Sequence, residues 1–267
     1  MSFVDHLEAL RWHIIRIIVA ISIGSIAAFS YMEFIYKDII LAPSKSSFIS
    51  YQWLCQLGKL IGFDSFCENE IPMNLQNIDM TGQFRFALSS SFVIGIIVAF
   101  PYIVYELWRF IKPALKSKEV LNGRTFIFFS SLLFFLGVIF GYFVLLPYSV
   151  NFFSNFSISP DLQNIITIKS YISLFLSLIL GSGLFFELPV IMYFLTKADL
   201  VTPDSLRSYR KIALVIVLSI SAIITPPDLI SQIIVSIPIM MLYEVGILVS
   251  KRVYKKKMRR ERELVNS

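Results

Sequence analysis

Apolar residues in this chain are gathered into long, nearly uninterrupted blocks. Runs of about 18 or more apolar residues indicate helices that cross a membrane, because at 1.5 Å per residue they span a hydrocarbon core of about 30 Å. The blocks predict an all-α, polytopic membrane protein with six spans. Their approximate bounds are Ile14–Tyr31, Phe86–Trp108, Thr125–Leu146, Tyr171–Leu195, Ile212–Ile224 and Leu229–Val249.

The last two spans are expected to be short. Ile212–Ile224 contains 13 residues, which reach only about 20 Å in a helix. The sixth span becomes continuously apolar only after Ser231 and Gln232. We hypothesise that the mismatch between this hairpin and the bilayer thins the membrane beside it.

Basic residues are distributed unevenly among the segments that join the spans. Segments 1–13, 109–124, 196–211 and 250–267 together carry 18 of the 24 Lys and Arg residues, and the alternate segments carry five. Segments rich in Lys and Arg stay in the cytoplasm. Both termini are therefore predicted to be cytoplasmic, which agrees with an even number of spans.

Composition supports a membrane protein and changes little else. Hydrophobic residues make up 56% of the chain and charged residues 16%, with a mean hydropathy of +0.73, whereas soluble domains contain about 25% charged residues. We expect one transmembrane domain over residues 1–250 and a basic cytoplasmic tail over residues 251–267. The tail, which begins KRVYKKKMRRERE, is interpreted as an anchor on anionic lipids and not as a nucleic-acid site.

Signals for catalysis are absent from the sequence. The histidines are His6 and His13 alone, and no metalloprotease, hydrolase or phosphate-loop motif occurs. We expect no enzyme activity, no cofactor and no metal site. Cys55 and Cys67 both lie in the first predicted external loop, where thiols oxidise; a disulfide is predicted, with two free thiols as the alternative.

Several acidic residues stand out in this apolar chain. Glu187 lies inside an apolar run, followed by Pro189, which is expected to kink the helix. An acid at membrane depth either pairs with polar groups to fix helix packing or belongs to a polar path or partner site. Glu106 and Glu244 lie near predicted cytoplasmic ends of spans, where long side chains reach water. The predicted cytoplasmic loops also carry Glu8 and Glu119, which are solvated charges unless a guanidinium ligand pairs with them.

Two stretches predict helix starts. In AIITPPDLISQ, residues 222–232, Thr225 fits an N-cap, Pro226 and Pro227 occupy positions that need no N–H donor, and Asp228 completes a capping box. This stretch predicts a sharp external turn between the last two spans. Thr202 followed by Pro203 predicts a second helix start, whose charged turn would lengthen the fifth span beyond the bilayer.

Five stretches, in order along the chain, resemble the TatC family, the integral subunit of the twin-arginine protein translocase. They are SFVDHLEALRWHII (2–15), FPYIVYELWRFIKPALKSKE (100–119), GYFVLLPYSVNFF (141–153), GLFFELPV (183–190) and ITPPDLISQIIVSIPIMMLYEVGI (224–247). The resemblance covers nearly the whole chain. It implies a receptor for twin-arginine signal peptides that scaffolds single-span partner subunits and exports folded proteins, driven by the proton motive force.

The resemblance also implies roles for particular residues. Signal-peptide binding is carried over to Glu8, Phe110 and Glu119. The family commonly has two adjacent acids before Leu-Arg, whereas Glu8 is followed here by Ala9, so Asp5 is a further candidate. The intramembrane contact is carried over to Glu187, and a partner-docking patch is carried over to Thr225 and Gln232. Glu106, which the resemblance does not single out, is a further candidate for a contact inside the membrane because it is an acid in a span.

Partners and location follow from the same resemblance. We expect TatA- and TatB-type single-span proteins, twin-arginine precursors and the lipid bilayer as partners, oligomers within the complex, and the bacterial cytoplasmic membrane as the location. The alternative is a secondary transporter of a small solute, which would also have kinked helices and an acid at membrane depth but typically shows paired halves. No such internal symmetry is visible in the sequence.

Overall fold

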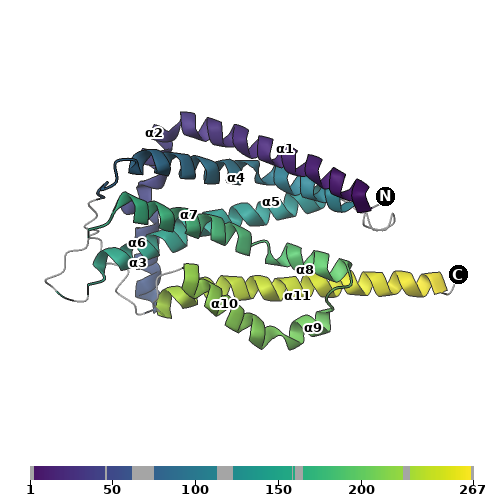
Figure 1. The fold of residues 1–267 in the computed structure, drawn as a ribbon. Helices are drawn as coiled ribbons and strands as arrows, with labels where there is room; N and C mark the ends of the chain where they lie inside the picture. Colours follow the sequence, from purple (N-terminus) through teal and green to yellow (C-terminus); the bar gives the residue numbers. More distant parts are fainter. Residues whose placement is uncertain are drawn as a thin grey trace.

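The computed structural model describes residues 3–45, 47–61, 75–112, 123–157, 159, 165–224 and 229–265. Long helices lie side by side, and both termini are at the same end of the bundle (Figure 1). The fold is all-α, as the apolar blocks predict. The long helices are α1 (Phe3–Ser30), α4 (Gly82–Ile111), α5 (Gly123–Phe140), α7 (Ile168–Phe185), α10 (Arg210–Ile224) and α11 (Leu229–Val265), and the shorter α8 (Leu188–Lys197) follows α7.

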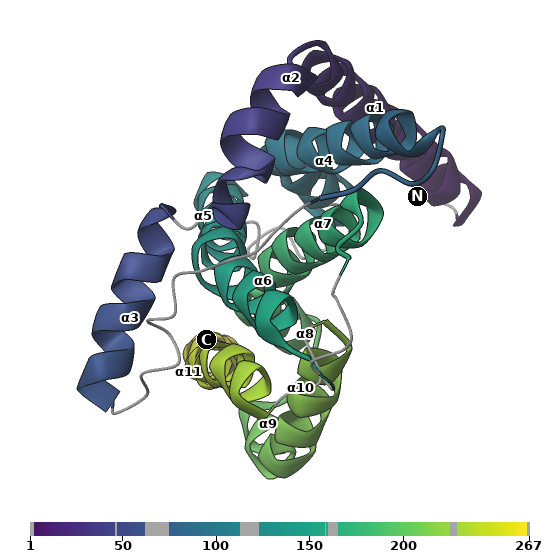
Figure 2. The ribbon, with the colours of Figure 1, turned by 90° about the vertical axis from the view of Figure 1, so that its left-hand side faces the viewer.

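Short helices gather at the opposite end of the bundle from the termini. They are α2 (Met32–Phe34), η1 (Ile35–Ile40), η2 (Ala42–Ser44), α3 (Ile49–Ile61), η6 (Gly141–Leu145) and α6 (Leu146–Asn155). Figures 1 and 2 show α3 lying across the direction of the long helices at this end. Tyr171 at the start of α7 donates to the carbonyl of Ile40. Tyr142 donates to the carbonyl of Ile39 at 2.8 Å, so two long segments hold the end of η1.

Among the described residues, four helical segments are long and apolar enough to cross a membrane: Glu8–Ser30, Gly82–Ile111, Gly123–Asn155 and Ile168–Lys197. Each contains most or all of one of the first four predicted spans. The helix α10 has 15 residues, which fits the prediction of a short last hairpin. The count of six spans stays a prediction. The division into a membrane domain and a tail also stays a prediction, because α11 continues without a break from Leu229 to Val265.

The long helices form a curved row (Figure 2), with α1 and α4 at one end and α10 with α11 at the other. In the described chain, α1 packs against α4 and only weakly against any other element. A methyl group on Gly95 of α4 would lie 2.8 Å from the carbonyl oxygen of Ile21 on α1. The α1–α4 pair therefore depends on backbones that approach closely, as small residues allow in membranes.

The charged turn before α10 differs from the prediction. It forms a separate helix, α9 (Pro203–Ser208), which ends at Tyr209 before α10 begins at Arg210. The predicted start is confirmed, because Thr202 caps α9 and forms a capping box with Ser205. Tyr243 of α11 donates to the carbonyl of Leu206 at 2.8 Å, so α9 packs against α11 instead of extending the fifth span in line.

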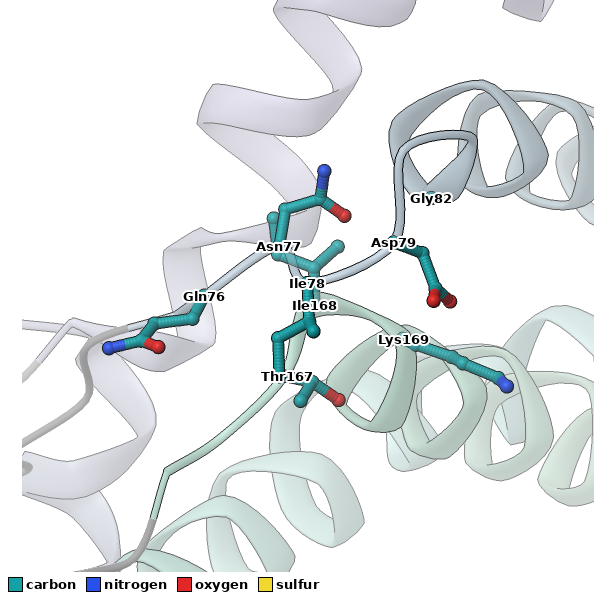
Figure 3. Close-up of a pocket in the computed structure, with 8 residues that line it drawn as sticks. All are labelled: Gln76, Asn77, Ile78, Asp79, Gly82, Thr167, Ile168 and Lys169. Atoms are coloured by element: carbon teal, nitrogen blue, oxygen red, sulfur yellow. The ribbon is translucent and has the colours of Figure 1, made fainter.

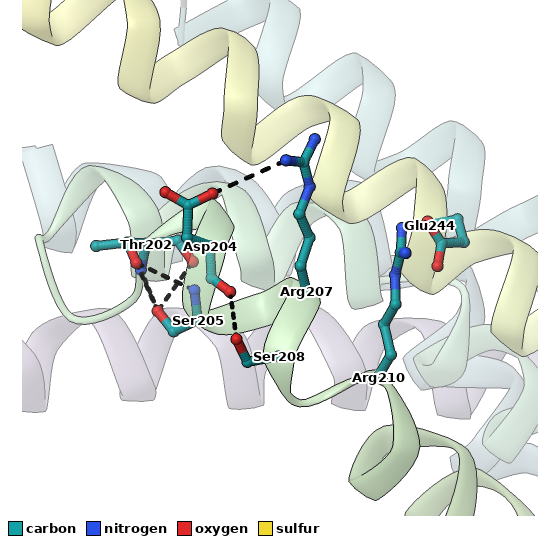
Figure 4. A network of polar contacts seen from close by, with 7 residues as sticks. All are labelled: Thr202, Asp204, Ser205, Arg207, Ser208, Arg210 and Glu244. Atoms are coloured by element: carbon teal, nitrogen blue, oxygen red, sulfur yellow. Dashed lines mark hydrogen bonds and ion pairs between the residues drawn. The ribbon is translucent and has the colours of Figure 1, made fainter.

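Polar contacts surround α9 and the start of α10 (Figure 4). Ser208 donates to the carbonyl of Asp204 at 3.0 Å, and the Asp204 carboxylate lies 3.8 Å from the Arg207 guanidinium. Arg210 donates to Glu244 at 2.6 Å, and the two side chains are 48% and 45% exposed. Glu244 thus reaches the surface, as predicted, and it also ties α10 to α11.

Candidate functional site

Glu187 lies in a break between two helices. α7 ends at Phe185 and α8 begins at Leu188, and Pro189 in the first turn of α8 has no N–H to continue the helix. The kink that Pro189 predicts is therefore confirmed as a full interruption. The carbonyl of Glu187 accepts from the N–H groups of Val190 and Ile191, both at 2.9 Å, so the interruption restarts a helix at once.

The Glu187 side chain points into the helix bundle. It is 8% exposed, and its Oε2 accepts a hydrogen bond from Ser130 of α5 at 2.7 Å. Its Oε1 is buried and has no hydrogen-bond partner among the described residues. The carboxyl thus keeps one acceptor position for a group outside the described chain.

Helices α5 and α7 approach closely beside Glu187. Gly183 is buried against the ring of Phe134, which lies 2.8 Å from where a methyl group would stand. On the facing helix, a methyl group on Gly137 would lie 2.5 Å from the carbonyl oxygen of Ser182. Phe134 stacks on Phe100 of α4 with ring centroids 3.5 Å apart, so three helices meet at the level of the acid.

A second acid, Glu106, forms a polar cluster between α1 and α4. We define the Glu106 cluster as Glu106, His13, Arg16, Tyr102 and Arg109. His13 Nδ1 hydrogen-bonds Glu106 Oε2, and Tyr102 donates to Oε1 at 3.0 Å. The Nη1 atoms of Arg16 and Arg109 lie 3.7 Å and 3.5 Å from the carboxylate.

Burial decides the role of this acid. The Glu106 side chain is 1% exposed, so the interpretation that it simply reaches water is wrong. An isolated carboxylate at that depth is costly, and here His13, Arg16, Tyr102 and Arg109 compensate for the charge. Glu106 thereby joins α1 to α4.

The residues expected to bind a signal peptide are only partly described. Glu8 is exposed near the start of α1, and Phe110 is partly buried near the end of α4. His13 packs edge-on against Phe110 with ring centroids 6.0 Å apart. Glu8 and Phe110 are therefore at the same end of the α1–α4 pair. Asp5 is on the same helix as Glu8, and Glu119 lies outside the described residues.

Of the remaining predicted residues, the structure describes Gln232 and Cys55. Gln232 of α11 donates to the carbonyl of Leu218 on α10 at 2.9 Å, so it holds the last two helices together. Thr225, Pro226, Pro227 and Asp228 are outside the described residues. Cys55 is on α3 and Cys67 is outside the described residues, so the disulfide stays a prediction.

A small pocket lies where the segment before α4 meets the start of α7. Gln76 and Thr167 form a parallel β-bridge there. The cavity of about 200 Å³ also borders Asp79 and Lys169 (Figure 3). No prediction was attached to these residues, and the bridge links the two segments at the end away from the termini.

Sequence reasoning missed His13, Arg16, Tyr102 and Arg109 as partners of Glu106. Tyr102, Glu106 and Arg109 follow one another at steps of four and three residues, which places them on one face of a helix. That spacing was a usable signal. His13 and Arg16 on α1 could not be found in this way, because nothing in the sequence pairs α1 with α4.

These helices, with two buried acids at helix contacts, define a multi-pass helical membrane protein. The sequence matches the family model described as "Sec-independent protein translocase protein (TatC)" over residues 5–238. The chain therefore belongs to the TatC family, and the resemblance seen in the sequence is confirmed.

Relatives of known name align with almost the entire chain. The TatC protein of Blattabacterium sp. subsp. Periplaneta americana (strain BPLAN) is 40% identical over 259 residues, which are 96% of this chain and 97% of the relative. The TatC protein of Aquifex aeolicus (strain VF5) is 33% identical over 258 residues, covering 96% and 98% of the two chains.

Solved structures agree with the sequence comparison. A crystal structure of the twin-arginine translocase receptor TatC is 33% identical and has a TM-score of 0.70, covering 93% of this chain and 99% of that one. A crystal structure of the same receptor in DDM gives a TM-score of 0.73 at 32% identity, covering 92% and 99%.

Proposed function

We propose that this protein is the receptor subunit of a twin-arginine translocase and binds twin-arginine signal peptides. One observation carries the proposal: the contact of His13 with Glu106 and Phe110 brings the start of α1 to the end of α4. Glu8 and Phe110, which come from distant parts of the sequence, therefore share one end of the bundle. Carboxylates bind guanidinium groups through charge-assisted, often paired hydrogen bonds.

The proposal includes a location and partners. Both termini lie at one end of the bundle (Figure 1), as expected if both are cytoplasmic in a bacterial cytoplasmic membrane. TatA- and TatB-type single-span proteins would scaffold on this subunit, with Gln232 and Thr225 in their docking patch, and the proton motive force would drive export. The similarity to translocase proteins over nearly the whole chain disfavours the small-solute transporter.

The proposed recognition predicts selective binding by the purified full-length protein. A fluorescent twin-arginine signal peptide should bind at least about tenfold more tightly than its twin-lysine version, because a forked guanidinium makes paired hydrogen bonds that an ammonium cannot. Glu8→Gln or Glu119→Gln should remove most of that difference. Fluorescence anisotropy with both peptides measures it.

Glu33→Gln is the matched control for the binding experiment. Glu33 is an exposed acid (84%) on α2, at the far end of the bundle, and pairs with Lys37 at 2.8 Å. The Glu33→Gln variant should keep the preference for the twin-arginine over the twin-lysine peptide. Equal binding of the two peptides, unaffected by Glu8→Gln and Glu119→Gln, would mean that the recognition site is misassigned.

The short last hairpin supports a second element of the proposal, local thinning of the bilayer. Inserting one apolar helical turn into both α10 and α11 should then slow export of bulky folded cargo, because the mismatch with the bilayer is reduced. The control is an insertion of the same length in α11 after Lys251, on the cytoplasmic side. Unchanged export after both membrane insertions would count against thinning.

A further inference from the structure

The two arginines of the Glu106 cluster keep most of their donors free. Glu106 has one negative charge, and its two oxygens already accept hydrogen bonds involving His13 and Tyr102. Arg16 and Arg109 lie 3.7 Å and 3.5 Å away, which makes ion pairs but leaves the guanidinium N–H groups available. In the part of the chain that the structure describes, no second carboxylate pairs with either arginine.

The arginines also face outward. Their side chains are 44% and 47% exposed, whereas Glu106 between them is 1% exposed. The outer side of α1 is not covered, because α1 packs on α4 and only 6% of its span is buried. Two positive charges over one buried negative charge therefore leave a net positive surface directed at the membrane environment.

Aromatic residues place this surface at the level of lipid headgroups. Trp12, Tyr102 and Tyr105 are 49%, 39% and 41% exposed around the arginines, and Arg109 lies 5.8 Å from the ring centroid of Tyr105. Exposed Trp and Tyr rings concentrate where a bilayer meets water. Arg109 is also only two residues from Ile111, the end of the span.

Deeper along the same two helices, the exposed side chains become apolar. Val19 and Ile23 of α1 are 51% and 65% exposed, and Val98 of α4 is 64% exposed. Such a surface, continuous with a positive group at headgroup level, matches a molecule with an anionic head and hydrocarbon chains. A free anion would use only the arginines.

We propose that Arg16 and Arg109 bind the phosphodiester group of an anionic phospholipid, in the leaflet at the end of the bundle that carries the termini. Each guanidinium can present a planar pair of donors to phosphate oxygens. Glu106 is the positioning residue, because its carboxylate holds one arginine from each helix beside the other. The proposal concerns the lipid contact of Arg16 and Arg109 and does not rest on the proposed receptor function, although His13 of the same cluster also contacts Phe110.

The test is native mass spectrometry of the full-length protein in detergent, with phosphatidylglycerol or phosphatidylcholine added. The wild-type protein should retain one phosphatidylglycerol more tightly than phosphatidylcholine, whose phosphate is neutralised by its own choline. The double variant Arg16→Gln/Arg109→Gln should lose this preference, with phosphatidylglycerol affinity lower by about tenfold or more, as expected when charge-assisted hydrogen bonds are removed. Arg16→Lys/Arg109→Lys should give an intermediate loss.

The double variant Arg85→Gln/Arg207→Gln is the matched control. Arg85 is exposed near the start of α4 and Arg207 is 43% exposed on α9, so the control also removes two positive charges, outside the Glu106 cluster and the basic tail. Helix content measured by circular dichroism checks that each variant is folded. Equal affinity for the two lipids, an equal loss in Arg85→Gln/Arg207→Gln, or displacement of the lipid by millimolar inorganic phosphate or by an acidic peptide would each overturn the proposal.

Discussion

Replacing Glu187 by alanine is expected to lower export of a folded twin-arginine cargo by about ten- to a hundredfold. The reason is the buried Oε1, which has no hydrogen-bond partner among the described residues, whereas Ser130 holds Oε2 at 2.7 Å. A buried hydrogen-bonding group that is left without its partner costs about 1–3 kcal/mol, and each 1.4 kcal/mol corresponds to a factor of ten. We hypothesise that a partner helix or the inserted signal peptide donates to this oxygen.

The measurement is the rate at which folded cargo reaches the far side of the membrane, normalised to the amount of variant protein in the membrane. Ser130→Ala is the matched control, because it removes the contact that Glu187 makes inside the bundle and leaves the carboxyl in place. It should reduce stability slightly and preserve most of the export. Normal export by Glu187→Ala would contradict the hypothesis that a partner helix or the inserted signal peptide contacts Glu187, and would leave Glu187 as a packing residue.

Gly137→Ala is expected to destabilise the protein by about 1–3 kcal/mol, the usual effect of inserting a methyl group into a tightly packed contact. The new Cβ would stand 2.5 Å from the carbonyl oxygen of Ser182 and 2.8 Å from the Cα of Gly183. Both are backbone atoms of α7, so no side chain can rotate away. The helices α5 and α7 must separate, which also moves Ser130 relative to Glu187.

Thermal unfolding in detergent, followed by loss of helical circular dichroism, measures this effect. Gly246→Ala on α11 is the control, because the three atoms nearest to its new methyl group all belong to the side chain of Met192, the nearest being the flexible sulfur. Its loss of stability should be clearly smaller. Equal losses in the two variants would show that the close approach of α5 and α7 is not what makes Gly137 sensitive.

Length and apolar content were enough to predict the long helices, and local signals predicted where two of them break or begin. Pro189 marks the interruption beside Glu187, and Thr202 caps α9. The gap at Tyr209 was not predicted. The Arg210 side chain after it pairs with Glu244, and Tyr243 holds Leu206, so contacts with α11 set the direction of α9.

The candidate site was harder to predict from the sequence than the helices, because in a membrane both the lipid-facing and the protein-facing sides of a helix are apolar. The sequence therefore could not show that α1 pairs with α4 or that Glu106 is 1% exposed. Glu187 was accessible to sequence reasoning, since a lone acid in an apolar run is a functional candidate in itself. Its partner Ser130 was not, because many serines lie in the apolar blocks.

The position of α1 at the edge of the row has a consequence for how the protein is made. During synthesis α1 enters the membrane before α4 exists, and about 50 residues separate the two helices. It packs mainly on α4 and buries only 6% of its span, so its largely apolar surface suits a helix that first resides alone in lipid. Until α4 is inserted, His13 and Arg16 have no Glu106 carboxylate to pair with. The insertion of α4 brings Glu106 to them and completes the α1–α4 pair. Helix insertion and helix pairing are therefore separate steps in the biogenesis of this protein.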